Sequence, residues 1–140
     1  MIHVMDLYTT LGNIVGADVP TDRPIDGFDQ TAYLLGNQEE SARDHRLVFY
    51  QGRMLAIRWN QYKAHFVIYD RYKSLSSAPQ DFGQIPRIYN LVSDPKELID
   101  IFGASGGTPL FQPMVAEAAR YLTSFQEFPN NDYSAIERSE

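Results

Sequence analysis

Apolar residues recur with a helical period at both ends of the chain and with a strand period between them. Near the N-terminus the apolar side chains share one helical face from residue 4 to residue 15, and Gly16 is suited to end that helix. A second helix is predicted over 108–129, where Thr108 can cap, Pro109 fits the first helical position and Pro129 ends the helix. The two apolar faces consist of Val4, Leu7, Tyr8, Leu11, Ile14 and Val15, and of Met114, Val115, Ala118, Tyr121, Leu122 and Phe125.

Four short segments between these helices are rich in β-branched and aromatic residues. Residues 47–50 and 54–59 flank a Gln-Gly-Arg turn and predict a β-hairpin, with further strands over 64–69 and 87–92. The fold class is therefore α+β. We expect a small four-stranded antiparallel sheet packed against a long C-terminal helix, with a short N-terminal helix and an ordered loop.

The connecting segments divide the chain without splitting it into separate domains. Its 140 residues suit a single domain, made of a helix and loop segment (1–45), the sheet (46–92), the last helix (108–129) and a frayed polar tail (130–140). Residues 19–27 are rich in Pro, Asp and Gly and predict an ordered loop. A short helical piece over 28–35, ending at Gly36, and a long loop over 70–86 complete the prediction.

Composition and charge exclude several classes of function. The 12 Lys and Arg residues against 18 Asp and Glu residues give a net charge of −6, which disfavours nucleic-acid binding. The chain has no Cys, and therefore no disulfide, thiolate metal site or Cys nucleophile. No apolar run reaches the ~18 residues of a membrane span, and the N-terminus does not have the pattern of a signal peptide. We expect no nucleic-acid or membrane partner, no cofactor and no metal.

A series of short matches, in constant order over residues 4–97, resembles the arylsulfatase family. The N-terminal matches are Asp6-Leu7-Tyr8-Thr9-Thr10-Leu11, Gly16, Pro20, Asp22-Arg23-Pro24-Ile25-Asp26-Gly27-Phe28-Asp29 and Leu34-Leu35-Gly36. The later matches are Ala56-Ile57-Arg58-Trp59, Lys63-Ala64-His65-Phe66, Tyr89-Asn90-Leu91 and Asp94-Pro95-Lys96-Glu97. The resemblance is to the C-terminal subdomain of these enzymes. Thr9 departs from the pattern, because the family usually has Pro there.

The resemblance carries over no catalytic residue. Sulfatases hydrolyse sulfate esters with a formylglycine made from the Cys or Ser of a C/S-x-P-x-R motif, beside a divalent metal. Here Ser77-Ala78-Pro79 and Ser93-Asp94-Pro95 have S-x-P without the Arg that should follow. The family's metal ligands lie upstream of the matched stretch. The resemblance therefore implies no sulfatase activity for this chain alone.

Two clusters are candidate ligand sites. In the first, Arg23 lies between the carboxylates of Asp22 and Asp26 and could bind an anion; the alternative is a salt-bridged structural loop in which Gly27 takes a positive φ.

The second cluster combines Arg58, Trp59, Lys63 and His65 on neighbouring strands, which suits an anionic or aromatic small molecule; the alternative is a solvated sheet face. A hydrolase built on His3, His45 or His65 has no supporting motif.

The leading functional prediction is a stand-alone, non-catalytic domain of this type that acts in binding or assembly. The alternative is a fragment of a split or truncated arylsulfatase that needs the N-terminal catalytic part. Without that part, apolar groups of the N-terminal segment lack cover, and exposed apolar patches mark interfaces. We therefore expect a homodimer or a complex with a separately encoded protein. The interface candidates are Leu7, Leu11, Ile14, Val15 and Phe28.

Overall fold

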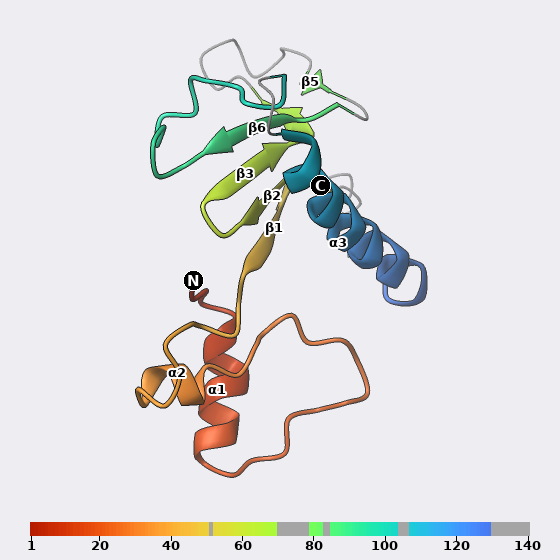
Figure 1. The fold of residues 1–140 in the computed structure, drawn as a ribbon. Helices are drawn as coiled ribbons and strands as arrows, with labels where there is room; N and C mark the ends of the chain where they lie inside the picture. The colour runs from red at the N-terminus through yellow and green to blue at the C-terminus, as the bar shows by residue number, and fades with distance from the viewer. Residues whose placement is uncertain (51, 70–78, 83–84, 104–106, 130–140) are drawn as a thin grey trace, which may run out of the picture. The chain divides into compact units, whose positions relative to one another are not determined.

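The computed structural model describes residues 1–50, 52–69, 79–82, 85–103 and 107–129. The chain folds as two compact units, Met1–His45 and Arg46–Glu140. The first unit corresponds to the predicted helix and loop segment. The elements, in chain order (Figure 1), are α1 (Asp6–Ile14), α2 (Thr31–Leu34), β1 (His45–Tyr50), β2 (Arg53–Trp59), β3 (Tyr62–His65), β4 (Val67–Ile68), β5 (Gln80–Asp81), β6 (Arg87–Asn90) and α3 (Gly107–Glu127).

The first unit consists of α1, α2 and the loop between them. Helix α1 ends where Gly16 adopts φ +70°, a left-handed conformation that Gly reaches without a steric penalty. The expectation of a positive φ at Gly27 was wrong, since the glycines with positive φ among the described residues are Gly16, Gly36 and Gly52. Gly27 is needed for a different reason. A Cβ there would lie 2.4 Å from the carbonyl oxygen of Met5, so only Gly allows the loop to approach α1 this closely.

The second unit contains the predicted four-stranded sheet, in the order β1-β2-β3-β6. The hairpin between β1 and β2 is confirmed, with Gly52 at φ +74° in its turn. The next turn is tighter than the sequence suggested: Asn60, at φ +49°, and Gln61 join β2 to β3, so that Trp59 pairs with Tyr62. Asn tolerates the left-handed conformation better than most residues.

The predicted strand 64–69 is broken at Phe66. Its amide donates a hydrogen bond to the carbonyl of Leu55 (2.8 Å), whereas its carbonyl accepts one from the amide of Phe82 (2.9 Å). Beyond this point β4 leaves the main sheet and pairs with β5 in a separate two-stranded sheet, which the sequence did not predict. Most of the rest of the predicted loop 70–86 lies outside the described residues. The predicted tail 130–140 lies wholly outside them.

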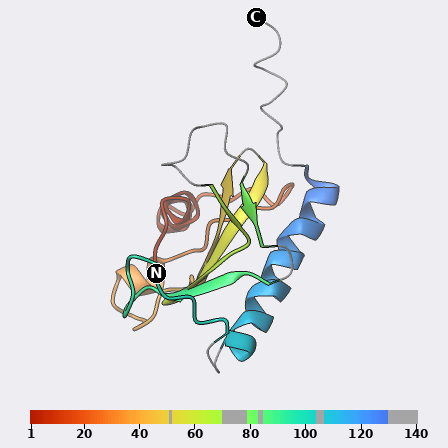
Figure 2. The ribbon, with the colours of Figure 1, turned by 90° about the horizontal axis from the view of Figure 1, so that it is seen from above.

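Helix α3 runs along one face of the sheet and covers the core (Figure 2). Ile57, Ala64 and Ile88 come from β2, β3 and β6, and with Met114 of α3 they are at most 1% exposed. The predicted apolar face of this helix is only partly buried: Val115 and Leu122 are exposed, because the contact follows the narrower line through Met114 and Ala118. None of the described helices is both long and apolar enough to cross a membrane.

Candidate functional site

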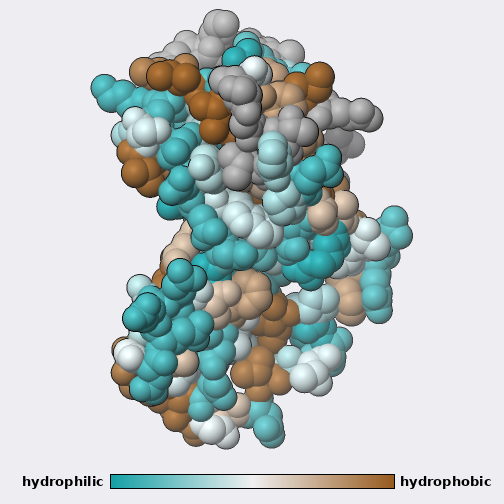
Figure 3. Space-filling view, viewed as in Figure 1, coloured by the Kyte–Doolittle hydropathy of each residue, from teal (hydrophilic) through white to brown (hydrophobic). Residues whose placement is uncertain are grey.

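A row of exposed apolar side chains lies along α1 and its C-terminal end. Leu7, Leu11 and Ile14 are 46–56% exposed, and Val15 is 75% exposed. Brown, apolar surface appears on this unit in Figure 3. The helical spacing of the row was predicted from the sequence. Phe28, the fifth interface candidate, is half-buried instead: its ring lies under the Arg43 guanidinium (4.6 Å) and meets the ring of His45 edge-on.

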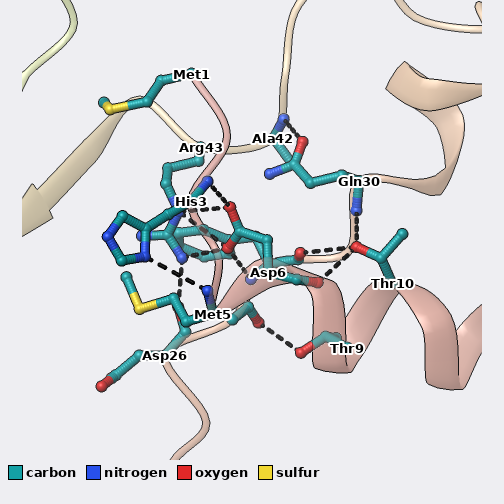
Figure 4. Close-up of polar contacts among 12 residues, drawn as sticks. Met1, His3, Met5, Asp6, Thr9, Thr10, Asp26, Gln30, Ala42 and Arg43 are labelled. Carbon is teal, nitrogen blue, oxygen red and sulfur yellow. Dashed lines mark hydrogen bonds and ion pairs between the residues drawn. The ribbon is translucent and has the colours of Figure 1, made fainter.

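A buried ion pair beside α1 organises the first unit (Figure 4). Arg43 Nε lies 3.0 and 2.9 Å from the two carboxylate oxygens of Asp6, and both side chains are fully buried. The amides of His3 and Phe28 also donate to this carboxylate, at 2.8 and 2.9 Å. Arg43 donates further to the carbonyls of Asp26 and His45. The pair therefore joins the start of α1 to segments 20 and 37 residues away.

The hydrogen bonds determine the charge state of Asp6. Burial alone would raise its pKa, but the bonds from Arg43 and from the amides of Phe28 and His3, with the charge of Arg43, lower it from 3.8 to about 2. Two hydroxyls extend the network. Thr10 donates to the Asp6 carbonyl (2.7 Å) and accepts from the Gln30 amide (3.0 Å). Thr9, where the family usually has Pro, donates to the carbonyl of Gly27 (3.1 Å).

The loop cluster predicted around Arg23 is split by the structure. Arg23 pairs with its neighbour Asp22 at 2.8 Å, and both side chains are more than 60% exposed. Asp26 contributes its backbone carbonyl, which accepts a hydrogen bond from Arg43. The three predicted ligand residues thus make two unrelated contacts within the first unit. Whether the loop binds an anion stays a prediction.

The strand cluster is brought together in part. Register pairs Arg58 with Lys63, and Ala56 with His65, so the side chains of Arg58, Lys63 and His65 share one face of the sheet. Trp59 points to the opposite face, where it packs against the core. Consecutive strand residues alternate between faces, so Arg58 and Trp59 cannot line the same side of the sheet. The structure therefore brings together the cationic residues of the predicted site, whereas its aromatic residue, Trp59, is part of the core.

Glu97 completes this cluster and was not among the predicted site residues. Its two carboxylate oxygens lie 2.6 Å from Lys63 Nζ and 2.6 Å from His65 Nε2, and all three side chains are 15–27% exposed. Its backbone has φ +56°, an uncommon conformation for a residue other than Gly. Glu97 belongs to the Asp-Pro-Lys-Glu match, but no spacing rule connects that turn to a strand more than 30 residues earlier.

The contacts of this cluster shift the pKa values of Glu97 and His65. Burial would raise the pKa of Glu97, but hydrogen bonds from Lys63 and His65 outweigh it and hold the pKa below its usual value. Burial and the neighbouring Lys63 charge lower the pKa of His65, against the opposing effect of Glu97. His45 lies in the other unit, bonded to Asp44 at 2.6 Å. Within the described ranges, no group of three or more His, Asp or Glu side chains is placed to hold a metal ion.

Comparison with known proteins shows which family this chain belongs to. The family described as the C-terminal region of aryl-sulfatase matches residues 41–134, about two thirds of the chain. The chain belongs to this family. Nearly the whole chain is similar to part of a sulfatase, since arylsulfatase G of Rattus norvegicus is 26% identical over 145 residues, covering 96% of this chain. N-acetylgalactosamine-6-sulfatase of Canis lupus familiaris is 41% identical over 64 residues, covering 45% of this chain.

A solved sulfatase has the same fold over nearly the whole chain. The crystal structure of PsFucS1 sulfatase from Pseudoalteromonas sp. matches 94% of this chain with a TM-score of 0.77 and 26% identity. In each case the match is to a small part of the relative: 27% of PsFucS1, 26% of arylsulfatase G and 12% of N-acetylgalactosamine-6-sulfatase. The chain thus spans about a quarter or less of the sulfatases it resembles, in the region that the family describes as C-terminal.

Proposed function

We propose that this chain is a sulfatase C-terminal region that acts in binding and assembly and brings no reacting group of its own. The observation that carries the proposal is the exposed apolar row on α1, formed by Leu7, Leu11, Ile14 and Val15. Contiguous exposed apolar side chains on a folded unit mark interaction surfaces. The natural occupant is a sulfatase catalytic region, because about three quarters of each full-length relative lies outside the matched part.

The row is large enough to support specific binding. Burying one Leu, Ile or Val side chain completely contributes ~1.5–3 kcal/mol, and these four are about half exposed or more. Covering them would therefore contribute about 4 kcal/mol, or roughly a thousandfold in the dissociation constant. A single charged substitution in the middle of the row should remove most of this contribution, because the charge would have to be desolvated.

The test uses the catalytic region of PsFucS1 with its matched segment deleted, mixed with this chain. Light scattering after size exclusion should show a one-to-one complex with the wild-type chain and none with Leu11→Asp. Leu122→Asp is the matched control, since Leu122 is 48% exposed on α3 but lies outside the row. The segment deleted from PsFucS1 is the positive control. Equal binding by the two Asp variants would reject α1 as the docking surface. A 32 kDa species of this chain alone, twice its 16.0 kDa, would instead establish the predicted homodimer.

A second function is favoured by the extent of the sequence matches. Because the relatives are sulfatases of which this chain corresponds to one part, the complex would regain sulfuric ester hydrolase activity. The assay is hydrolysis of an aryl sulfate by the same mixture. Activity that needs both components supports a split sulfatase, whereas a stable but inactive complex supports the non-catalytic role.

A further inference from the structure

The face of the sheet opposite α3 concentrates positive charge. Arg58, Lys63 and His65 share this face, and β6 adds Arg87, which pairs with His65 in register. Among the described residues, the carboxylates that pair with these groups are Glu97, which contacts Lys63 and His65, and Asp100, whose oxygen lies 3.9 Å from Arg87 Nη1. In the described part of the chain, three permanently charged side chains, Arg58, Lys63 and Arg87, thus face two carboxylates, on a protein with a net charge of −6. The composition of the whole chain does not explain this local excess.

Arg58 carries the excess charge. Its Nε donates to the carbonyl of Asn60 at 3.0 Å, and among the described residues it has no carboxylate partner. Lys63 lies directly across from it on β3, where paired side chains are ~5 Å apart at Cβ. Lys63 is in turn bound to Glu97. Of these two adjacent cations, Lys63 has a side-chain carboxylate partner and Arg58 has none among the described residues.

The loop that delivers this carboxylate holds Glu97 in an unfavourable backbone conformation. Glu97 has φ +56°, and its amide bonds the carbonyl of Asp94. The Asp94 carboxylate accepts the amides of Leu98 and Ile99, both at 2.7 Å. Leu98 and Ile99 are nevertheless 76% and 67% exposed, so packing does not force the loop into this shape. The two hydrogen bonds to Lys63 and His65 are the contacts that compensate for the unfavourable backbone conformation of Glu97. Strain of this kind at a charged residue is typical of functional sites.

We infer that Lys63, His65 and Arg58 form a binding site for an oxyanion, and that Glu97 fills this site when no ligand is bound. The ligand class is a molecule with a carboxylate or sulfate group, because two oxygens of either group can replace the two Glu97 oxygens. Arg58 then supplies a further charged donor that Glu97 leaves without a carboxylate. Release of the carboxylate also frees Glu97 from its left-handed conformation. The inference does not depend on the α1 docking surface, which lies in the other unit.

Glu97→Gly tests the inference most cleanly, because Gly adopts φ +56° without strain and the loop keeps its shape. Isothermal titration with sodium sulfate, and separately with sodium acetate, is done at constant ionic strength in chloride. We expect the variant to bind at least about tenfold tighter than the wild-type chain, with a shift of the His65 imidazole resonances. Glu117→Gln is the matched control. It removes the same charge from an ion pair on α3 and should leave affinity unchanged. Tighter binding of only one salt would assign the ligand class to that group.

A second variant separates a binding site from a general gain in positive charge. In Glu97→Gly combined with Lys63→Met, the tighter binding should be lost, because one of the three donors of the site, a charged one, is gone. Glu97→Asn replaces Glu97→Gly if the glycine variant unfolds, since Asn also tolerates a positive φ. The inference is overturned if the Glu97 variant binds both salts no more tightly than the Glu117 control. It is equally overturned if the gain in affinity persists without Lys63.

Discussion

The buried pair of Asp6 and Arg43 makes the stability of the first unit depend on one carboxylate. Asp6→Asn keeps the size of the side chain but removes its charge, and it turns an NH₂ group toward an Arg43 side chain that is fully buried. The lowering of the Asp6 pKa from 3.8 to about 2 corresponds to about 2 kcal/mol, at ~1.4 kcal/mol per pKa unit. Removing one partner of a buried ion pair typically costs ~3–5 kcal/mol, because the remaining charge has no partner. We expect a loss of about 2–4 kcal/mol.

Amide hydrogen exchange, read by mass spectrometry, measures this loss locally. A change of about 2 kcal/mol accelerates exchange of the α1 amides at least about 30-fold, after correction for intrinsic rates. Asp22→Asn is the matched control. It breaks an ion pair that is largely exposed, and it should leave the exchange of α1 unchanged. Fluorescence of Trp59, the single Trp of the chain, reports the second unit independently. Equal exchange of α1 in the two Asn variants would refute the central role of this pair.

The same pair determines how acid acts on the first unit. The pKa of Asp6 is lower in the folded state than in the unfolded state, so its contribution is fully present above about pH 4. The contribution is lost as the pH falls from about 4 toward 2, because the unfolded chain takes up the proton first. Exchange of α1 should therefore accelerate over this range in the wild-type chain. In Asp6→Asn this component of the pH dependence should be absent.

Three further changes test the account at other places. Gly27→Ala should destabilise the first unit by about 2 kcal/mol or more, since its Cβ would overlap the Met5 carbonyl, whereas Gly103→Ala meets open space and should have little effect in a thermal melt. Met114→Ala should cost ~2–5 kcal/mol in urea unfolding followed by Trp fluorescence; an unchanged midpoint would contradict the proposed core. In an NMR titration, Glu97→Gly should lower the pKa of His65 further, because Glu97 is the group that raises it; an unchanged or higher midpoint would show that the 2.6 Å contact is not formed.

Local patterns were sufficient to predict most of the fold. The helical spacing of Leu7, Leu11 and Ile14 located α1, and Gly52 between two apolar runs located the first hairpin. The small sheet of β4 and β5 was missed because its two strands are two residues each and have no apolar alternation to reveal them. The break at Phe66 depends on a hydrogen bond to a residue 16 positions later, which is invisible to any local pattern.

The candidate sites were predictable only where their residues are neighbours along one strand or one helix. Lys63 and His65 are two apart, so their shared face follows from the alternation of strand side chains once β3 begins at Tyr62; the predicted strand began only at residue 64. Glu97 and Arg43 reach their partners across 32 and 37 residues. They stand in turn and loop sequence where charged residues are common. Only the folding of the chain brings Glu97 and Arg43 to their partners, and a single sequence contains no signal for such long-range contacts.

The most direct test of the central claim is the mass of the species formed by this chain and the PsFucS1 catalytic region lacking its matched segment. Light scattering after size exclusion should give the sum of the two masses for the wild-type chain, and two separate species for Leu11→Asp. A wild-type chain that elutes at 16.0 kDa beside the free catalytic region, while the deleted PsFucS1 segment restores the complex, would contradict the claim that this protein acts through assembly on α1.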